Sequence, residues 1–573
     1  MRSTSFLLIF AALAAAQPNP IETAFPVLDP SSWTSGEPEA AGDVAMNRSG
    51  DGVVVWRTRT TTTPVSAYEI WAQPLRRGSL LGVPLLMATP TDGFTGAGEL
   101  LRVRCAIDDF GNWVVVWDGD AASGFNLVCR ARRFHGATQT LGPVVLVTDG
   151  AGGQHRVLPD VALGRYPTET ASSFWVVWQD GVAAGQTRIR MRRFRIDAGG
   201  ATPIDVPQPI LDVNSEATLP TQGQDRPAIG VATDATVTVL WQKFAVWGPG
   251  SGYWRPMLRS RRGATWLPVF DPTSPAANPQ GFDFTDYEVS SLGDPAAGSN
   301  PFSPPRVAVA PDGRVVAAWC RNSGAPFGFR IFTASSTAMT PGTVLAHLPT
   351  SWSVFHRRFD VAMTNEGSIL LAWEALAALN ISGQVRLNRI DANSGLSREE
   401  VSIDPIAGQA LTSVAIGAAG TGRVHVAWSR GTGPAFQRIH VREADLNLLA
   451  RSPTSGTTLD LWIPGGANFT YVLWPLASSG GPYAQTPIGD GRAADFSLTD
   501  PLLQWHLAQG PNPPVLPAAI GNVLQDGTAS LPVVLPPAVL PLTLSFVVAI
   551  VDPAQPGATS LRSFTQPEAL IIN

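Results

Sequence analysis

The sequence predicts an all-β protein, a seven-bladed β-propeller followed by a small C-terminal β-sandwich. Three observations carry this prediction. The 573 residues include 55 Gly and 50 Pro but only 15% charged residues, a composition typical of many short strands joined by turns. An apolar run that ends in tryptophan recurs seven times. Beyond Pro453 this repeat stops, and strand-like runs of another kind follow.

The repeated run is mostly apolar and ends in tryptophan, and a Gly turn often precedes it. Neighbouring tryptophans are separated by roughly 62 residues on average, and such a period indicates an array of supersecondary units. The copies are GDGVVVW (ending at Trp56), FGNWVVVW (Trp117), SSFWVVW (Trp178), ATVTVLW (Trp241), DGRVVAAW (Trp319), EGSILLAW (Trp373) and TGRVHVAW (Trp428).

Each unit also contains strands on both sides of this run. About eleven residues before the tryptophan stands an apolar triplet with a small central residue, as in Val44-Ala45-Met46, and we assign Val414-Ala415-Ile416 to the same role in the seventh unit. After the tryptophan comes a strand that alternates apolar with polar residues, as in IRMRRFRI (189–196), which indicates one buried and one wetter face. Together with a fourth short apolar patch, these strands make a propeller blade. The tryptophan run is apolar on both faces because a blade is packed between two neighbours.

Other architectures do not match the period. An immunoglobulin-like sandwich needs about 100 residues, and the coils of a parallel β-helix are much shorter than this unit. The seventh unit lacks an obvious fourth strand, whereas PVLDP (26–30) nearly repeats PVFDP (268–272) of the fourth unit. We therefore expect a propeller over residues 17–452 that is closed by a strand at about 24–30.

The N-terminus has the form of an export signal over residues 1–16. Arg2 is followed by a short apolar run and by Ala14-Ala15-Ala16 before Gln17, as signal peptidase requires. We expect a secreted protein, at the cell surface, outside the cell or in the periplasm, with no membrane span. The net charge of −5 offers no basic field for nucleic acid.

Residues 453–573 contain strand-like runs separated by Gly and Pro turns, which suit a small β-sandwich. The runs are TLDLWIP, FTYVLWPL, LLQWHLA, TASLPVVLP, LTLSFVVAIVD and EALIIN.

A DG or GN turn, VVVW, a variable loop and an I-x-x-R-x-F strand resemble the propeller repeats of secreted bacterial proteins of mostly unknown role. The resemblance covers about residues 24–452 and departs from the pattern in units three and four, which lack the Gly turn. The C-terminal part resembles the β-sandwich modules that end many exported bacterial proteins. This resemblance implies a module for surface retention or packing, and it carries no catalytic residue.

Known catalytic and metal motifs are absent from the sequence, and we expect no cofactor and no metal. Cys105 and Cys129 fall on the first and third strands of one sheet, too far apart for a disulfide. His425 and His440 lie symmetrically about Thr432-Gly433. They are expected to face each other as an ordinary cross-strand pair, the alternative being two ligands of a metal site.

The fourth unit has the longest loops, and they are rich in rings and acids. Long loops on a rigid scaffold are where binding residues concentrate, and rings stack on the apolar face of a sugar while acids accept from its hydroxyls. The alternative is that the rings merely cover the edges of an enlarged blade. We predict a glycan-binding surface bordered by Trp247, Tyr253, Trp254, Asp283 and Tyr287.

Two functions remain open on these observations. The favoured one is a secreted, non-catalytic protein that binds a polysaccharide or a cell-surface protein, because no catalytic signature is found. The alternative is an extracellular carbohydrate-active hydrolase or lyase on a propeller scaffold, which the acidic and aromatic loops of the fourth unit suggest.

Overall fold

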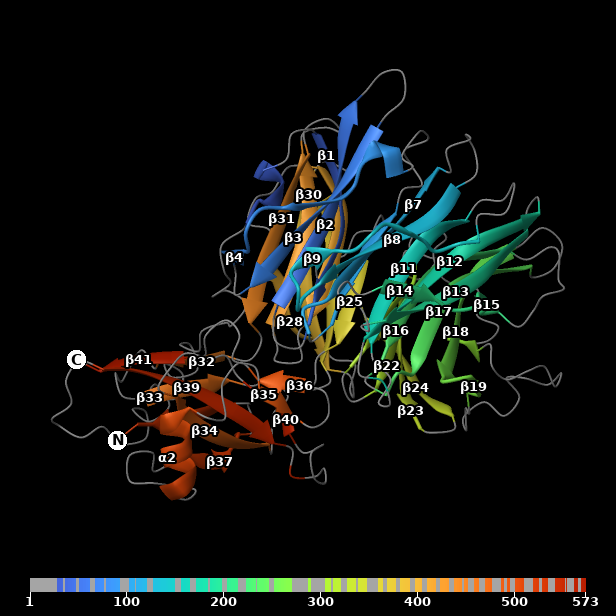
Figure 1. The fold of residues 1–573 in the computed structure, drawn as a ribbon. Coiled ribbons are helices and arrows are strands. Elements are labelled where there is room, and N and C mark those ends of the chain that lie inside the picture. Colours follow the sequence, from blue (N-terminus) through green and yellow to red (C-terminus); the bar gives the residue numbers. More distant parts are fainter. Residues whose placement is uncertain are drawn as a thin grey trace.

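The computed structural model describes most of residues 28–572 (Figure 1). The longer segments outside the description are 1–27, which include the predicted signal peptide, and 93–101, 215–222, 270–286, 290–303, 348–358, 477–485, 510–518 and 534–541. Within the described residues the fold is all-β, with one α-helix, α2 (Pro501–Gln509), and two 3-10 helices, η1 (Pro30–Trp33) and η2 (Pro90–Asp92).

Seven antiparallel sheets follow one another along the chain from β1 to β31, and in each the first, second and third strands are neighbours. The first sheet contains β1 (Glu37–Met46), β2 (Asp51–Thr61), β3 (Ala67–Arg76), β4 (Ser79–Leu80) and β5 (Leu85–Ala88). The second contains β6 (Val103–Ile107), β7 (Trp113–Asp120), β8 (Leu127–His135), β9 (Thr140–Leu141) and β10 (Val145–Leu146). The third contains β11 (Arg156–Gly164), β12 (Ser173–Ala183), β13 (Gln186–Asp197), β14 (Ile204–Pro207) and β15 (Leu211–Asp212). The fourth contains β16 (Gln224–Val231), β17 (Val237–Val246), β18 (Gly252–Arg262), β19 (Thr265–Leu267) and β20 (Tyr287–Glu288).

The last three of these sheets have fewer strands. The fifth contains β21 (Arg306–Val309), β22 (Val315–Cys320), β23 (Phe327–Ala334) and β24 (Met339–His347). The sixth contains β25 (Phe359–Met363), β26 (Ser368–Ala377), β27 (Ser382–Asp391) and β28 (Ser397–Ser402), and the seventh contains β29 (Ala410–Ala418), β30 (Arg423–Gly431) and β31 (Gln437–Asp445).

The second strand of each sheet is buried on both faces, as its unbroken apolar run predicts. In β2, Val53 and Val55 pack against residues of the second sheet, whereas Val54 and Trp56 pack against residues of the seventh. Successive side chains of a strand point to opposite faces, so one strand contributes to two cores. All seven tryptophans of the repeat are at most 1% exposed: Trp56, Trp117, Trp178, Trp241, Trp319, Trp373 and Trp428.

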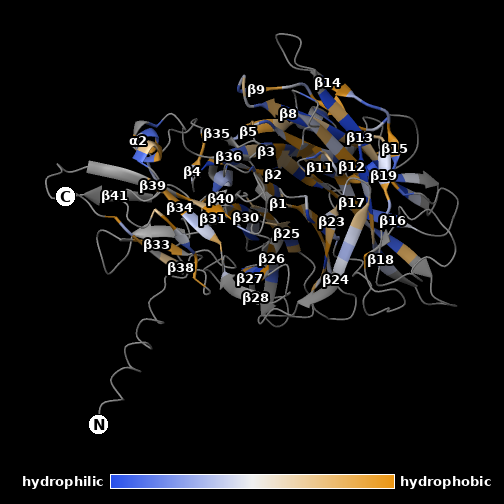
Figure 2. Ribbon diagram, turned by 90° about the horizontal axis from the view of Figure 1, so that it is seen from below, coloured by the Kyte–Doolittle hydropathy of each residue, from blue (hydrophilic) through white to orange (hydrophobic). Residues whose placement is uncertain are grey.

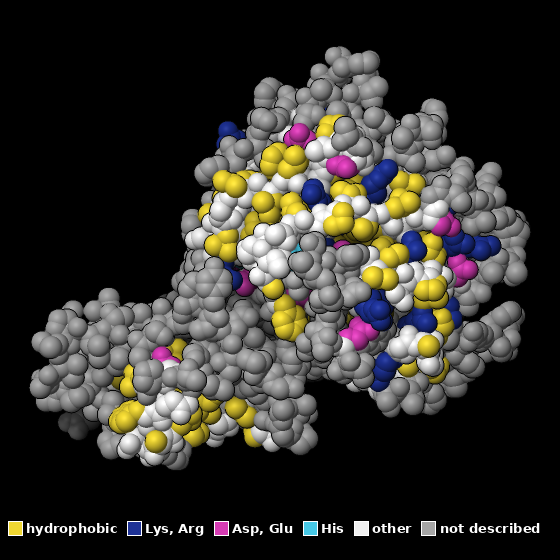
Figure 3. Space-filling model, in the orientation of Figure 1, with side chains coloured by type: hydrophobic (Ala, Val, Ile, Leu, Met, Phe, Trp, Pro, Cys, Tyr) yellow, Lys and Arg dark blue, Asp and Glu magenta, His cyan; other side chains and the backbone are white. Residues whose placement is uncertain are grey.

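The third strands alternate, as the sequence pattern predicts. In β13, Ile189 and Met191 are buried, whereas Arg190 between them is only partly covered. Arg190 donates to Asp212 of β15 at 2.9 Å. On the face drawn in Figure 3, basic and acidic side chains lie intermixed.

The first strands of consecutive sheets are in contact, from β1 with β6 through to β25 with β29, and β29 also contacts β1. Leu28 forms an antiparallel bridge with Val441 on β31, with N···O distances of 2.9 and 3.1 Å. Beside it, the Ser31 hydroxyl accepts from the Ile439 amide at 3.2 Å, and Arg438 pairs with Asp29 at 2.9 Å. The segment expected at about 24–30 is otherwise outside the described residues.

The register corrects one assignment in the seventh sheet. In the first sheet Asp43 pairs with Val55, one residue before the tryptophan, and Val44 pairs with Val54. In the seventh sheet the residue that pairs one position before the tryptophan is Ala415. The triplet equivalent to Val44-Ala45-Met46 is therefore Ile416-Gly417-Ala418, two residues later than predicted, because both segments satisfy the same apolar pattern.

The C-terminal strands lie to one side of the seven sheets in both views (Figures 1 and 2). Two sheets share one apolar core, which includes Leu459, Leu473 and Val548. One sheet contains β32 (Leu448–Arg451), β33 (Thr458–Trp462) and β38 (Thr528–Pro532), and the other β34 (Thr470–Leu476), β37 (Ile520–Asn522), β39 (Leu542–Val551), β40 (Leu561–Phe564) and β41 (Glu568–Ile572). A separate hairpin pairs β35 (Thr486–Ile488) with β36 (Arg492–Ala494).

The run LLQWHLA, predicted as a strand, is instead the helix α2. Asp500 caps it, because its carboxylate accepts from the amides of Leu502 and Leu503 at 2.9 and 3.2 Å. Pro501 follows at the first helical position, where its missing N–H costs nothing. No helix among the described residues is long and apolar enough to cross a membrane.

Candidate functional site

Three of the five predicted glycan-binding residues lie in strands of the fourth sheet. Tyr253 and Trp254 lie in β18 and Tyr287 lies in β20, whereas Trp247 and Asp283 fall outside the described residues.

Trp254 packs edge-on against Phe244, with ring centroids 5.4 Å apart. Its ring also lies beside Gly223, whose carbonyl accepts from the Phe244 amide at 2.9 Å. Trp254 is therefore partly covered, at the edge of the sheet where β16 begins.

The two histidines do not face each other. His425 pairs across the ladder with Glu443, and His440 pairs with Trp428. His425 Nε2 lies 2.9 Å from a Glu443 carboxylate oxygen, and both side chains are buried. The expectation of a histidine pair was wrong because the hairpin closes from Gly431 to Gln437, around a longer turn than one centred on Thr432-Gly433. Within the described part of the chain, no three His, Cys, Asp or Glu side chains gather as a metal site would require.

Cys105, Cys129 and Cys320 are buried free thiols. The Cys105 Sγ lies 3.7 Å from the Val53 carbonyl of the neighbouring sheet, and burial raises the pKa of its thiol well above the ordinary value. A buried thiol held in this protonated form is a poor nucleophile.

A cluster of charged side chains lies on the first strands, and the sequence analysis did not identify it. Each first strand has one residue that pairs one position before the tryptophan of its second strand. In five of the seven sheets this residue is charged, and we call these five residues the first-strand cluster: Asp43, Arg104, Asp160, Arg306 and Asp360.

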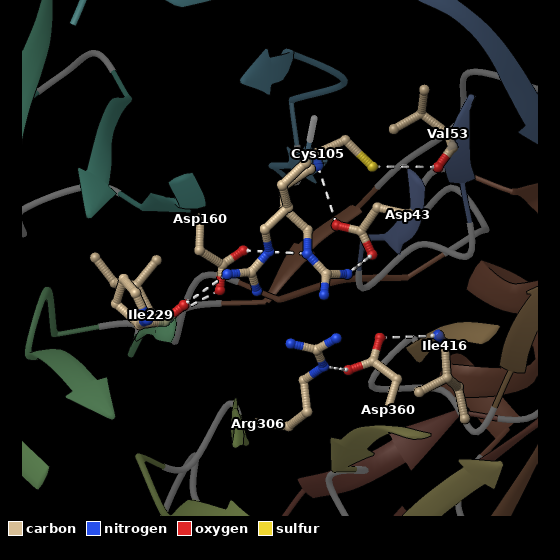
Figure 4. Close-up of polar contacts among 11 residues, drawn as sticks. Asp43, Val53, Cys105, Asp160, Ile229, Arg306, Asp360 and Ile416 are labelled. Atoms are coloured by element: carbon tan, nitrogen blue, oxygen red, sulfur yellow. Dashed lines mark hydrogen bonds and ion pairs between the residues drawn. The ribbon is translucent and has the colours of Figure 1, made fainter. Parts of the chain in front are cut away.

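The charges alternate where the sheets are neighbours. Arg104 Nη1 donates to Asp43 at 3.1 Å, and its Nε lies 3.8 Å from Asp160 on the other side. Arg306 Nε lies 3.0 Å from Asp360. Figure 4 shows Asp43, Asp160, Arg306 and Asp360 pointing toward a common centre. Their side chains keep only a small exposed fraction, between 8% and 15% for the whole cluster.

Each aspartate of the cluster also joins its sheet to the next. Asp43 accepts from the Cys105 amide at 3.0 Å, Asp160 from the Ile229 amide at 3.1 Å, and Asp360 from the Ile416 amide at 3.2 Å (Figure 4). The donor is in every case the residue after the cluster position of the following sheet. The three carboxylates thus have a structural role, because they fix the stagger between neighbouring first strands.

Arg102 reaches the same region from just before β6. Its Nη1 donates to the carbonyls of Leu158 and Pro227 at 3.3 and 3.0 Å, so one guanidinium links three sheets. Asp118 supports this arrangement, because its carboxylate accepts from the amides of Arg102 and Leu158 at 2.6 and 2.8 Å.

The backbone beside Arg102 is irregular at two places. Leu158 and Arg226 have positive φ angles of 57° and 54°, and each lies in a register shift just before the cluster position of its strand. Bulky residues adopt this conformation at a cost of about 1–3 kcal/mol each, usually where function or packing demands it. The two shifts turn the Leu158 and Pro227 carbonyls toward Arg102.

Burial displaces the proton equilibria of Asp43 and Arg306 in the cluster and of Arg102 and Asp118 beside it. Burial raises the pKa of Asp43 to about 6, against the opposing effect of the Arg104 guanidinium. Burial also raises the pKa of Asp118 to about 7. Burial and the nearby Arg104 charge lower the pKa of Arg102 to about 9 and of Arg306 to about 10. Such displaced pKa values gather at functional sites.

The sequence does contain the signal for this cluster. The residue before each apolar triplet is charged in AGDVAM, RVRCAI, LPDVAL, PPRVAV and RFDVAM. Each of these charged residues alone is typical of the polar end of a strand. They are far apart in the chain, and they come together only because the first strands of neighbouring sheets pack against one another.

Similar proteins are found only among solved structures. No family model matches the sequence, and no curated protein matches it. A protein of unknown function from Dyadobacter fermentans is 11% identical with a TM-score of 0.39, and the match covers 72% of this chain and 96% of that one. An ulvan lyase bound to a GlcA(1-4)Rha3S unit is 10% identical with a TM-score of 0.43, covering 70% and 94%. An α-L-arabinanase of Penicillium chrysogenum is 10% identical with a TM-score of 0.35, covering 74% and 98%.

These comparisons correct the favoured interpretation of the sequence. The expected non-catalytic binding protein is contradicted, because the solved structures that this chain resembles are mostly glycoside hydrolases and polysaccharide lyases. At about 10% identity they do not say what this chain does.

Proposed function

We propose that the protein is an extracellular carbohydrate-active enzyme, a hydrolase or lyase that cleaves a polysaccharide at the first-strand cluster. In this proposal the seven sheets from β1 to β31 form a seven-bladed propeller, and residues 1–16 are a signal peptide that directs secretion. The β-sandwich begins at β32 rather than at the expected residue 453, because Leu448–Arg451 pairs with β33.

The observation that carries the proposal is the position of the Asp43 carboxyl group. It is nearly buried beside the Arg104 guanidinium, and Asp160 and Asp360 point toward the same centre (Figure 4). Its pKa of about 6 lies close to neutral pH, where a group can both take up and release a proton during a reaction. It stands 3.1 Å from the Arg104 guanidinium, and the neighbouring Asp160 and Asp360 charges favour its protonated form. Burial raises this pKa although the Arg104 guanidinium acts to lower it.

The cluster offers the groups that cleavage of a glycosidic bond needs. Hydrolysis uses two carboxyl groups, one as acid and one as base or nucleophile, and the cluster holds three. Elimination needs a base together with cationic groups that stabilise developing negative charge, and the Arg306 guanidinium lies 3.0 Å from Asp360. The products distinguish the two reactions.

We further propose that Trp247, Tyr253, Trp254, Asp283 and Tyr287 border the surface along which the polysaccharide lies. The support is the position of Tyr253 and Trp254. They lie at the start of β18, at the edge of the fourth sheet where β16 begins, since Gln224 pairs with Lys243 and Lys243 with Arg255. The cluster position of the same sheet, Ala228, is four residues further along β16.

The test is a screen of neutral and acidic polysaccharides that measures new reducing ends and, separately, the absorbance of unsaturated products. We expect one class of product from the wild-type protein. Asp43→Asn keeps the shape and an acceptor for the Cys105 amide but cannot exchange a proton. Its kcat is expected to fall by about 100-fold or more, with loss of the pH dependence near pH 6.

Asp212→Asn is the matched control, because Asp212 is a half-exposed carboxylate on β15 that forms an ion pair away from the cluster. It is expected to retain wild-type activity. The proposal is wrong if the wild-type protein releases neither product from any polysaccharide, or if Asp43→Asn is as active as Asp212→Asn.

A further inference from the structure

The seven equivalent first-strand positions include two that carry no charge. In sheet order they are Asp43, Arg104, Asp160, Ala228, Arg306, Asp360 and Ala415. Each arginine is expected to have an aspartate on both sides if the alternation is complete. Arg104 has both, Asp43 and Asp160. Arg306 has only Asp360, because the position on its other side is Ala228.

The missing carboxylate leaves donors of Arg306 without acceptors. Its Nη1 is buried and has no hydrogen-bond partner among the described residues, and its Nε contacts Asp360 without hydrogen-bond geometry. A buried N–H group without a partner costs about 1–3 kcal/mol, and more when it carries charge. The site therefore favours an acceptor that the described chain does not supply.

Arg102 carries a second unsatisfied donor, and its guanidinium is anchored next to Ala228. Its Nη1 is held by the Pro227 carbonyl, next to Ala228 in the chain. Its Nη2 is buried and lacks a partner in the described structure. Ala228 is itself 1% exposed, and its methyl group cannot accept from either guanidinium.

The backbone provides a third donor at this register. Every aspartate of the cluster accepts from the amide that follows the cluster position in the next sheet. For the Ala228 position that amide belongs to Val307, which pairs with Ala317 just as Cys105 pairs with Val115. An acidic group beside Ala228 thus has two guanidinium groups and an amide around it.

We propose that the position beside Ala228, between Arg102 and Arg306, binds the carboxylate of a uronic acid residue in the substrate, which takes the place of the missing aspartate. This inference rests on the proposed function, because it assigns the substrate of that site to the acidic polysaccharides. A carboxylate is the group that the equivalent positions already hold, and its two oxygens match the paired N–H groups of a guanidinium. A neutral sugar leaves the same donors unpaired.

The test supplies the missing carboxylate from the protein itself. Ala228→Asp should complete the alternation, raise the Tm of the ligand-free protein and weaken binding of an oligogalacturonate at least tenfold. Ala228→Asn has nearly the same size without the charge, and is expected to retain more of the binding than the aspartate variant. Binding is measured by calorimetry and by the ligand-induced rise in Tm, so that the result does not depend on cleavage.

Three probes separate the chemistry: the oligogalacturonate, its methyl ester and inorganic sulfate. We expect only the free acid to raise the Tm of the wild-type protein, and we expect this rise to be lost in Ala228→Asp. The inference is overturned if the methyl ester binds equally well, if Ala228→Asp binds the acid as the wild type does, or if sulfate gives the same Ala228-dependent effect. If the acid binds but no polysaccharide is cleaved, the proposed function is wrong and this inference stands. If the protein cleaves neutral glycans and Ala228→Asp does not change that activity, the proposed function stands and this inference is wrong.

Discussion

Asp118 makes the stability of the protein depend on pH in a direction opposite to that of most aspartates. Its side chain is fully buried, and burial raises its pKa from 3.8 to about 7 although two backbone amides donate to it. Between these pH values the folded state keeps the proton that the unfolded state has lost. Raising the pH through this window therefore favours unfolding.

The displacement of the pKa sets the size of the effect. Each tenfold change in a proton equilibrium is about 1.4 kcal/mol, so a pKa that rises from 3.8 to about 7 corresponds to about 4 kcal/mol. This stability is present below pH 4 and is lost progressively as the pH approaches 7. The steepest loss is about 1.4 kcal/mol per pH unit.

Asp118→Asn removes the titration and keeps the shape of the side chain. One backbone amide then faces the side-chain NH2 group instead of an oxygen, which costs about 1–3 kcal/mol at every pH. We expect the variant to be less stable than the wild type at pH 4.5 and to gain on it steadily up to pH 7.5. Asp43, whose pKa is also raised, titrates in both proteins and cancels in the difference.

The assay is the Tm from tryptophan fluorescence at pH values from 4.5 to 7.5, for the wild type, Asp118→Asn and the surface control Asp212→Asn. The wild-type Tm relative to Asp118→Asn is expected to fall by several degrees over this range, whereas Asp212→Asn follows the wild type. Parallel curves for the wild type and Asp118→Asn would refute the reasoning, because they mean that Asp118 is ionised in the folded state throughout.

Two further predictions concern the N-terminal pairing and the aromatic residues. Deleting residues 24–30 removes the two hydrogen bonds between Leu28 and Val441, and we expect it to lower the Tm far more than deleting residues 17–22; equal Tm values contradict this. Replacing Trp247 and Trp254 together by alanine is expected to abolish retention in a polysaccharide affinity gel and to leave the Tm nearly unchanged. Retention by the double variant, or its unfolding, places the glycan surface elsewhere.

The sequence predicts best where burial leaves one choice of residue. The tryptophan strands must be apolar on both faces, and their position in the middle of each sheet follows. The pattern fails where two solutions satisfy it equally, as with Val414-Ala415-Ile416 and Ile416-Gly417-Ala418. It also fails for 502–508, where apolar residues suit a strand or a helix, and where Asp500 and Pro501 mark the helix start.

The candidate site is harder to predict because its residues meet only through tertiary structure. Asp43 and Arg104 are 61 positions apart, and neither belongs to a local motif. The raised pKa of Asp43 depends on burial and on charges from three other sheets. A charged residue is visible in the sequence before five of the seven triplets. Which of these residues become neighbours is known only once the first strands pack against one another.

The contact between Asp29 and Arg438 joins residues 409 positions apart, and this separation affects how the chain assembles. At about 5–20 residues per second, β31 leaves the ribosome roughly 20–80 s after Leu28. During that interval the N-terminal segment has no strand to pair with, and β31 then emerges with an open edge. Two chains made close together can therefore exchange N-terminal segments, each completing the other.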